Sequence, residues 1–310
     1  MINEKIFITG GAGFLGRSII ERFYKNNEIT VYSRDEAKHY YLKKDYPNVK
    51  FVVGDIRNRE HLLRQSRNHT IGIFAASLKQ IDACTDNFEE AKKIIIDGAI
   101  NSRYAAEDNG FKAACFVSTD KSRSATTIYG SMKYVAGDCF IAGSSNCNLT
   151  TVIYGNVTNS TGSIIPLMWN SVKNKKTLSL YGSEMTRFLL DVNDAVSLIE
   201  KSLTYKKCNV VPVINSFKVK DLMDIFSEEF GLKYEVSKPR TGEKIHEIML
   251  SAEEIRRTEY KSVDDIYLLH PEKEFDTLKQ FENNEEYSSK NFCLSKDELY
   301  EYLKKRNFYK

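Results

Sequence analysis

A glycine-rich loop near the N-terminus is the feature that most limits the fold of this chain. Residues 5–9 have the pattern of a buried strand, and residues 14–24 have the pattern of a helix. Between them, Gly10 permits a tight turn, Gly13 lets a pyrophosphate approach the backbone, and Gly16 allows close packing of helix against strand. Free N–H groups at the start of a helix attract an anion. The order strand, glycine loop, helix therefore predicts dinucleotide binding. The predicted contacts in the loop are Gly10, Gly13, Phe14, Leu15 and Gly16.

The rest of the first half continues the alternation of strand and helix. Apolar runs predict strands at 28–32, 50–53, 71–75, 114–118 and 149–153, and helical patterns cover 88–107 and 127–142. Strands that alternate with helices form a parallel sheet with helices on both faces. We therefore predict an α/β fold with a doubly wound parallel sheet of the Rossmann type.

The regular alternation ends after Gly155, and polar turns and isolated helices follow. We expect residues 1–160 to form the cofactor-binding domain, with 188–214 returning to it through a strand at 209–214. Residues 161–187 and 215–310 are expected to form a smaller, mixed α/β substrate-binding domain. The final part of the chain, rich in Lys, Glu, Tyr and Asn, is predicted to be helical at 296–305.

Charge and composition exclude several classes of partner. The 310 residues include 45 basic and 42 acidic side chains, a formal charge of +3, which gives no argument for nucleic acid or an anionic membrane. No window reaches the ~18 apolar residues of a spanning helix, and the N-terminus lacks a signal-peptide pattern. We therefore expect a cytoplasmic protein with six reduced cysteines. Neither the cysteines nor His246 and His270 have metal-ligand spacing, so no metal site is expected.

The end of the second predicted strand indicates the type of cofactor. A carboxylate there binds a ribose 2′-hydroxyl, whereas an arginine suits a 2′-phosphate. Ser33 and Arg34 follow this strand and favour NADP, although Asp35 leaves NAD possible. Further along, Asp55 and Ile56 are positioned to face the adenine.

Tyr129 and Lys133 follow the fifth predicted strand and share one helix face, because they are four residues apart. A neighbouring ammonium stabilises a phenolate and lowers the phenol's pKa from its usual value near 10. Tyr129 is thus a candidate base that takes a proton from a substrate hydroxyl, and Lys133 is a candidate ligand of the cofactor ribose.

Thr119, Asp120 and Lys121 end the fifth predicted strand. Ligands bind at the carboxyl ends of the strands in such sheets, so these three side chains should enter the site together. A simple reductase needs only a hydroxyl at this point. The adjacent acid and amine therefore indicate further proton transfers.

Seven motifs in order resemble the UDP-N-acetylglucosamine 4,6-dehydratases that invert carbon 5. These enzymes belong to the polysaccharide-biosynthesis group of extended short-chain dehydrogenases/reductases. The resemblance extends from about Lys5 to Ser251. It depends on Tyr32-Ser-Arg-Asp-Glu36, Ala75-Ala-Ser-Leu-Lys-Gln80, Ser118-Thr-Asp-Lys121, Tyr129 with Lys133, Tyr154-Gly-Asn-Val157, Met185-Thr-Arg-Phe188 and Gly242-Glu-Lys-Ile-His-Glu247.

The resemblance also implies contacts in the second half of the chain. Asn156 is expected to contact the diphosphate of a UDP-sugar, Arg187 and Arg240 to add positive charge, and Glu243 to lie near the uridine. Lys79 is a further expected substrate contact. The cofactor contacts that it implies are Ala75 and Ala76.

The resemblance implies a lyase reaction in which NADP is recycled. A hydride leaves C4 while Tyr129 deprotonates the 4-hydroxyl and Thr119 hydrogen-bonds its oxygen, and the hydride later returns to C6. Lys121 removes the C5 proton, and Asp120 protonates the departing 6-hydroxyl. For this role the pKa of Lys121 should be lowered by burial and by cations such as Lys133 or Arg123.

Three alternatives remain open. A UDP-sugar C4 epimerase needs only the Tyr129–Lys133 pair and a cofactor, and a C5-retaining dehydratase shares the same fold. A non-catalytic NADP-binding sensor would need neither the pair nor Asp120. The family resemblance further implies surface polysaccharide or glycan synthesis and a homo-oligomer of two or more copies.

Overall fold

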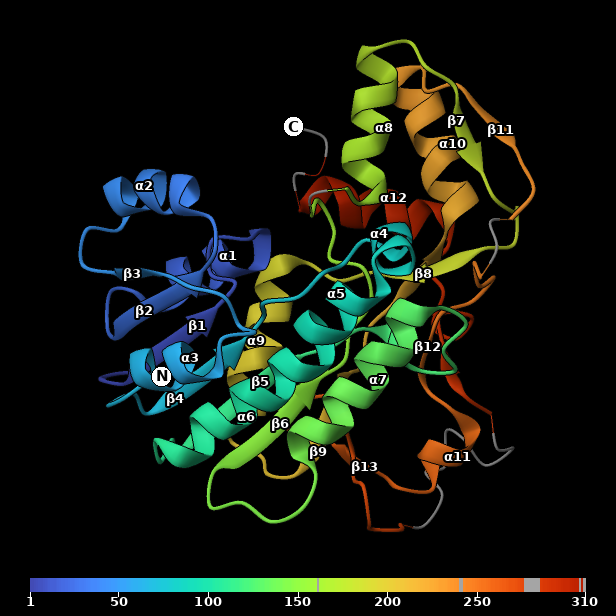
Figure 1. Ribbon diagram of the computed structural model, residues 1–310. Helices are drawn as coiled ribbons and strands as arrows, with labels where there is room; N and C mark the ends of the chain where they lie inside the picture. The colour runs from blue at the N-terminus through green and yellow to red at the C-terminus, as the bar shows by residue number, and fades with distance from the viewer. Residues whose placement is uncertain (161, 240–241, 276–284, 307, 309–310) are drawn as a thin grey trace.

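A nine-stranded sheet forms the centre of the molecule (Figure 1). The computed structural model describes residues 1–160, 162–239, 242–275, 285–306 and 308. Seven neighbouring strands are parallel, in the order β3 (Lys50–Val53), β2 (Glu28–Ser33), β1 (Lys5–Thr9), β4 (Ile71–Phe74), β5 (Ala113–Val117), β6 (Asn148–Val152) and β9 (Cys208–Pro212). The antiparallel strands β14 (Ile266–Leu269) and β13 (Thr258–Lys261) extend the sheet beyond β9. The predicted doubly wound parallel sheet is confirmed.

Helices cover both faces of the sheet, because side chains alternate along each strand. In β1, Ile6 and Ile8 pack into one hydrophobic core, whereas Phe7 packs into the other. Helices α1 (Phe14–Phe23) and α9 (Val192–Ser202) contribute to the first core. The second core receives α3 (Arg59–Gln65), α6 (Gly98–Asp108) and α7 (Ile128–Ile141). Helix α2 (Glu36–Asp45) lies between β2 and β3 in the sequence.

The helix predicted at 88–107 is interrupted. It consists of α5 (Phe88–Lys92), a π-helical segment η1 (Lys93–Asp97) and then α6, and the short helix α4 (Ile81–Asp86) precedes it. A π segment inserts one extra residue per turn and is frequent at functional sites. Here its residue Ile94 lines the large pocket described below.

Helix α7 agrees with the helix predicted at 127–142. The hydroxyl of Thr127 caps its N-terminus and accepts a hydrogen bond from Gly130 N. This cap fixes the start of the helix that carries Tyr129 and Lys133. Between β5 and α7, the 3₁₀ turn η2 (Asp120–Ser122) carries the predicted acid and amine.

A smaller part lies beside the carboxyl ends of the parallel strands and has its own apolar core (Figure 1). Its helices are α8 (Ile164–Lys173), α10 (Val219–Phe230) and α12 (Lys296–Lys305), with the strand pair β7 (Leu178–Leu180) and β11 (Tyr234–Val236). The other short elements are the pair β8 (Thr186–Phe188) and β10 (Ser216–Lys218), the pair β12 (Ile248–Leu250) and β15 (Tyr287–Ser288), and helix α11 (Ala252–Ile255).

One domain boundary needs correction. We expected all of 215–310 to lie outside the main sheet, but β13 and β14 belong to it. All four residues of β14 are buried, which suits a strand covered on both faces. Its short apolar run does not reveal which sheet it joins, so the sequence left this open. The rest of the division into two domains stays a prediction. Among the described residues, none of the helices has both the length and the apolar content needed to cross a bilayer.

Candidate active site

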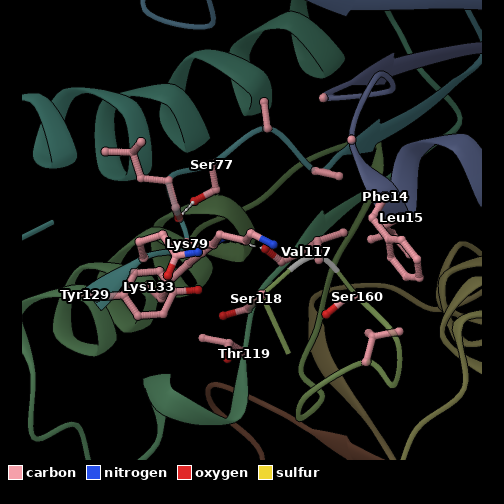
Figure 2. Close-up of a pocket in the computed structure, with 18 of the residues that line it drawn as sticks. Phe14, Leu15, Ser77, Lys79, Val117, Ser118, Thr119, Tyr129, Lys133 and Ser160 are labelled. Carbon is pink, nitrogen blue, oxygen red and sulfur yellow. Dashed lines mark hydrogen bonds between the residues drawn. The ribbon is translucent and has the colours of Figure 1, made fainter. Parts of the chain in front are cut away.

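A cavity of about 1350 Å³ follows the carboxyl ends of the parallel strands and continues toward the smaller part of the chain. Figure 2 shows Tyr129, Lys133 and Lys79 gathered on one side of it and Phe14 and Leu15 on the other. The structure thus brings together residues that are far apart in the sequence. The predicted residues that line the cavity are Gly10, Gly13, Phe14, Leu15, Gly16, Ser33, Arg34, Asp55, Ile56, Ala75, Ala76, Lys79, Thr119, Lys121, Tyr129, Lys133, Asn156 and Glu243.

The glycine loop has the geometry that a dinucleotide requires. Gly10 has a φ of +72°, and a Cβ atom there would lie 2.9 Å from the Ala76 backbone. A Cβ on Gly16 would lie 2.4 Å from the Cα of Gly11, so the helix can pack this closely only with glycine. Gly13 caps α1 without a side-chain hydrogen bond, which leaves N–H groups of the first turn for an anion. These residues fit a dinucleotide phosphate.

The end of β2 supplies polar groups at one end of the cavity. Arg34 lies 3.9 Å from Asp55, and its side chain is 57% exposed. The carboxylate of Asp35 caps α2 by accepting a hydrogen bond from Lys38 N and pairs with the Lys38 ammonium at 2.7 Å. The Asp35 charge is therefore already partly neutralised.

Ser33 is hydrogen-bonded to a histidine that sequence reasoning did not single out. The Ser33 hydroxyl and Nε2 of His39 share a hydrogen bond of 2.5 Å. His39 is buried on α2, and its burial lowers the pKa of the imidazole. A neutral imidazole thus fixes the orientation of a hydroxyl that lines the cavity.

Tyr129 and Lys133 are both buried beside the cavity, and their titration differs from the prediction. Burial raises the pKa of the Tyr129 phenol to about 12, with Lys121 opposing the rise. Burial lowers the pKa of Lys133 to about 7, and its ammonium donates to Val117 O at 2.8 Å. The prediction that Lys133 lowers the Tyr129 pKa is wrong for this state, because burial dominates both groups.

Asp120 and Lys121 form a buried ion pair in the turn η2. Lys121 Nζ lies 3.2 Å from Asp120 Oδ1, and Thr119 Oγ1 donates to the same oxygen at 2.9 Å. Asp120 is 1% exposed, and burial raises the pKa of its carboxyl group, with the neighbouring Lys121 ammonium opposing the rise. The other oxygen, Oδ2, has no hydrogen-bond partner among the described residues.

The expected lowering of the Lys121 pKa is not found. Burial lowers this pKa, but the carboxylates of Asp120 and Glu247 raise it more, and the net shift is upward. The predicted cations are engaged elsewhere: Lys133 donates to Val117 O, and Arg123 pairs with Glu254 at 2.6 Å. The sequence could not reveal that a distant carboxylate, rather than a cation, faces the amine.

The predicted substrate contacts are only partly assembled. Asn156 accepts a hydrogen bond from Lys121 Nζ at 3.1 Å and lines the cavity. Arg187 lies behind the cavity wall, where it donates to Glu243 at 2.5 Å and to main-chain oxygens of Thr186 and Ile245. Its predicted contact with a diphosphate stays a prediction. Arg240 lies outside the described residues.

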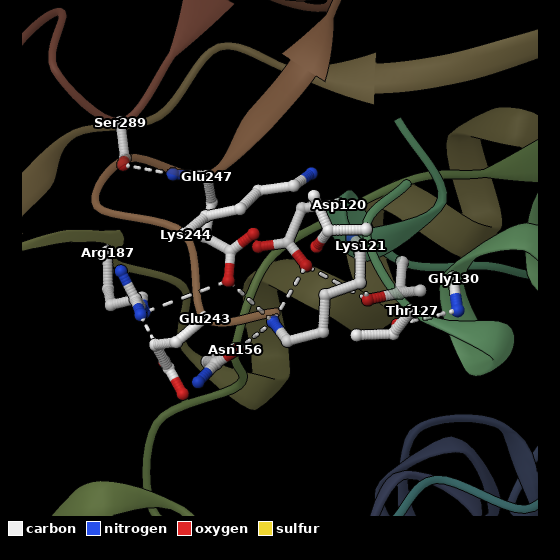
Figure 3. Close-up of polar contacts among 12 residues, drawn as sticks. Asp120, Lys121, Thr127, Gly130, Asn156, Arg187, Glu243, Lys244, Glu247 and Ser289 are labelled. Carbon is white, nitrogen blue, oxygen red and sulfur yellow. Dashed lines mark hydrogen bonds and ion pairs between the residues drawn. The ribbon is translucent and has the colours of Figure 1, made fainter. Parts of the chain in front are cut away.

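Glu247 is the acidic group at this site that sequence reasoning missed. It is 3% exposed, and its Oε1 lies 3.0 Å from Lys121 Nζ. Figure 3 draws this contact as a dashed line. The signal was present, because Glu247 ends the motif that begins at Gly242. In the described residues, no group of three or more His, Cys, Asp or Glu side chains is arranged to hold a metal ion.

The parallel sheet with its glycine loop and the Tyr129–Lys133 pair define an extended short-chain dehydrogenase/reductase. Comparison with family models matches residues 6–270 to the family described as polysaccharide biosynthesis protein. This match covers well over half of the sequence. The chain belongs to this family.

Two relatives differ in the reaction that their names give. UDP-N-acetylglucosamine 4,6-dehydratase (inverting) from Campylobacter jejuni is 32% identical over 272 residues, which cover 83% of this chain and 81% of that protein. UDP-glucose 4-epimerase from Rickettsia bellii is 32% identical over 277 residues, which cover 83% and 81%. The names of these relatives thus include both the 4,6-dehydration and the C4 epimerisation considered above.

Two solved structures agree in fold. Pen from Bacillus thuringiensis superimposes with a TM-score of 0.89 at 25% identity and covers 99% of both chains. DesIV from Streptomyces venezuelae, a dTDP-glucose 4,6-dehydratase solved with NAD and TYD bound, has a TM-score of 0.68 at 18% identity. It covers 78% of this chain and 86% of that chain, so the likeness extends beyond the cofactor-binding sheet.

Proposed function

We propose that this protein is an NADP-dependent UDP-N-acetylglucosamine 4,6-dehydratase that inverts C5. Its product is then a UDP-4-keto-6-deoxy-hexosamine for surface polysaccharide or glycan synthesis. One observation carries the proposal: Lys121, which is paired with the buried Asp120, lines the same cavity as Tyr129 and Lys133. A second acid–amine pair is what an elimination needs beyond an oxidation, and the name of the Campylobacter relative agrees with it.

Each step is assigned to a residue. Tyr129 takes the proton of the 4-hydroxyl, and Thr119 orients that oxygen. When bound, the nicotinamide accepts the C4 hydride and later returns it to C6. Asp120, whose pKa is raised by burial, donates its proton to the departing 6-hydroxyl. Lys121 accepts the C5 proton, although it must first lose the proton that its neighbouring carboxylates stabilise.

The preference for NADP is supported by the end of β2. Arg34 lines the cavity, and the hydroxyl of Ser33 is oriented by its hydrogen bond with His39. The carboxylate of Asp35 forms an ion pair with Lys38. A nicotinamide cofactor of some kind agrees with NAD in the DesIV structure. A 2′-phosphate would receive one charge-assisted hydrogen bond from Arg34 and one hydrogen bond from Ser33.

A C4 epimerase is the second candidate, because the Rickettsia relative carries that name at the same identity. An epimerase needs Tyr129, Lys133 and the cofactor, but it gives no task to Asp120 and Lys121. The two reactions differ in mass, since only dehydration removes water from the sugar.

Incubation with UDP-N-acetylglucosamine tests the proposal directly. Mass spectrometry should show the loss of one water, and NMR should show an L-configured product. A D-configured product would assign the retaining reaction, and an isomer of unchanged mass would assign the epimerase. We also propose a homo-oligomer, which light scattering after size exclusion can test.

Lys121→Ala is the sharpest variant for the proposed reaction. It should still reduce bound cofactor on mixing with substrate, because Tyr129 remains, yet it should release no dehydrated product. Absorbance of the reduced nicotinamide and product mass report the two steps separately. Full dehydratase activity in this variant would remove Lys121 from the mechanism.

A further inference from the structure

Glu247 and Lys121 make a close contact between opposite charges, and both residues line the cavity. Lys121 Nζ lies 3.0 Å from Glu247 Oε1, 3.2 Å from Asp120 Oδ1 and 3.1 Å from Asn156 Oδ1 (Figure 3). The ammonium is thus surrounded by three acceptors. In this arrangement Lys121 has no lone pair with which to take a proton from carbon.

The C-terminal part of the chain holds Glu247 in this position. Ser289 N donates to Glu247 O at 2.7 Å, and Glu247 N donates to Ser289 Oγ at 2.9 Å. Ser289 is fully buried and is also hydrogen-bonded to Thr186. These two hydrogen bonds hold the main chain of Glu247, and its carboxylate lies beside Lys121 of the turn η2. Ser289, which the sequence analysis did not single out, thus helps to place Glu247.

The charged and titratable groups around this pair come from four parts of the chain. Asp120 lies on η2, Tyr129 on α7, Arg187 on β8, and Lys244 on the segment before β12. Burial raises the pKa of Glu247, but Lys121 and Arg187 lower it more, so the resting group is a carboxylate. Burial acts against both charges of the Glu247–Lys121 pair.

We propose that Glu247 is a positioning residue that accepts the surplus proton of Lys121 and so converts it into a base; this inference rests on the proposed dehydratase function. The Lys121 N–H bond breaks and an O–H bond forms on Glu247, which leaves a neutral amine and a neutral acid. The amine then takes the C5 proton, and the electron pair of the C–H bond moves toward the C4 carbonyl. Asp120 protonates the departing hydroxyl, and water leaves. Glu247 returns its proton once Lys121 has passed on its own.

A bound substrate favours this transfer for two physical reasons. It removes water from the cavity, and a neutral pair needs less solvation than an ion pair in a low-dielectric site. The predicted diphosphate contact would also require the Arg187 guanidinium, whose Nε lies 3.8 Å from Glu247, to leave its bonds with Glu243 and the main chain. A guanidinium drawn toward a diphosphate stabilises the Glu247 carboxylate less.

Glu247→Gln is the decisive variant, because the amide keeps the size and an oxygen acceptor but binds no proton. Its first step, read as cofactor reduction on mixing with substrate, should stay within about threefold of the unaltered protein. Loss of water should slow by about 100-fold at pH 7, within the range for general acid–base groups. Because Lys121 must then lose its proton to solvent, the elimination rate should rise about tenfold per pH unit between pH 7 and pH 9. The unaltered protein should show a flat profile.

Two further variants separate proton acceptance from structure. Glu247→Asp keeps an acid and should keep the flat pH profile even if it is slower. Glu253→Gln, an exposed site on α11, should match the unaltered protein. Wild-type elimination by Glu247→Gln, or a rate that falls equally at every pH, overturns the role of Glu247. If the unaltered protein removes no water from UDP-N-acetylglucosamine, the proposed function fails as well.

Discussion

Lys133 should make the stability of this protein depend on pH in a way that one substitution abolishes. The side chain is 4% exposed, its ammonium lies 4.7 Å from the centre of the Phe116 ring, and Val117 O is its hydrogen-bond acceptor. Burial lowers its pKa from 10.5 to about 7. Between these two values the unfolded chain binds a proton that the native state does not. The free energy of unfolding therefore rises with pH across this window. As the pH falls toward 7, the protein loses the same amount of stability, because the unfolded chain gains a proton that the native state does not bind.

The magnitude follows from the same shift. One pKa unit corresponds to about 1.4 kcal/mol, so the unaltered protein should gain on the order of 2 kcal/mol between pH 7 and pH 9 from this group. Lys133→Met keeps an unbranched side chain of similar length and removes the titration. At pH 7 this variant should be more stable than the unaltered protein. Between pH 7 and pH 9 its free energy of unfolding should lack the rise that Lys133 causes in the unaltered protein.

Urea unfolding of the cofactor-free protein at pH 7 and pH 9 measures the effect. All other titrating groups are common to both proteins, so the difference between their pH slopes isolates Lys133. Lys93→Met, at a surface side chain that is 52% exposed, is the matched control and should keep the slope of the unaltered protein. Equal slopes in the unaltered protein and Lys133→Met would refute the argument that Lys133 is buried without a charge partner.

Two further predictions concern the cofactor and the first proton transfer. Arg34→Ala should weaken NADP⁺ binding about tenfold, the lower range for a charge-assisted hydrogen bond because the side chain is exposed, and should leave NAD⁺ unchanged by calorimetry. Equal losses for both cofactors would contradict a 2′-phosphate contact. Tyr129→Phe keeps the buried ring, so turnover should fall by about 10²–10⁴-fold at an unchanged melting temperature. Near-full turnover in this variant would assign the base to another group.

The sequence predicted the parallel sheet well because its signals are local. The glycine loop and the apolar runs at β1, β2, β4, β5 and β6 each depend on neighbouring residues, and a parallel topology follows from their order. The hairpin of β13 and β14 depends on pairing with β9, which is distant in sequence. No local pattern encodes that partner, and the boundary of the smaller domain was misjudged there.

The candidate site shows the same division between local and distant contacts. Asp120 and Lys121 were found because they end a strand, and Tyr129 and Lys133 because they share a helix face. Their pKa shifts were mispredicted because those depend on burial and on Glu247, which approaches from a distant part of the chain. Spacing in a sequence identifies the groups of a site, whereas their protonation depends on the packing around them.

The two buried lysines illustrate why that packing matters for the chemistry. Lys133 faces an aromatic ring and a carbonyl, and burial lowers its pKa, whereas Lys121 faces two carboxylates that raise its pKa. A single cavity thus holds one amine that is readily neutral and one that is charged at rest. An oxidation at C4 alone requires only the first. In the proposed elimination the second must give up its proton during the reaction, and a buried carboxylate at 3.0 Å could accept that proton. The proposed dehydratase reaction therefore gives the Glu247–Lys121 pair a task that an epimerisation would not give it.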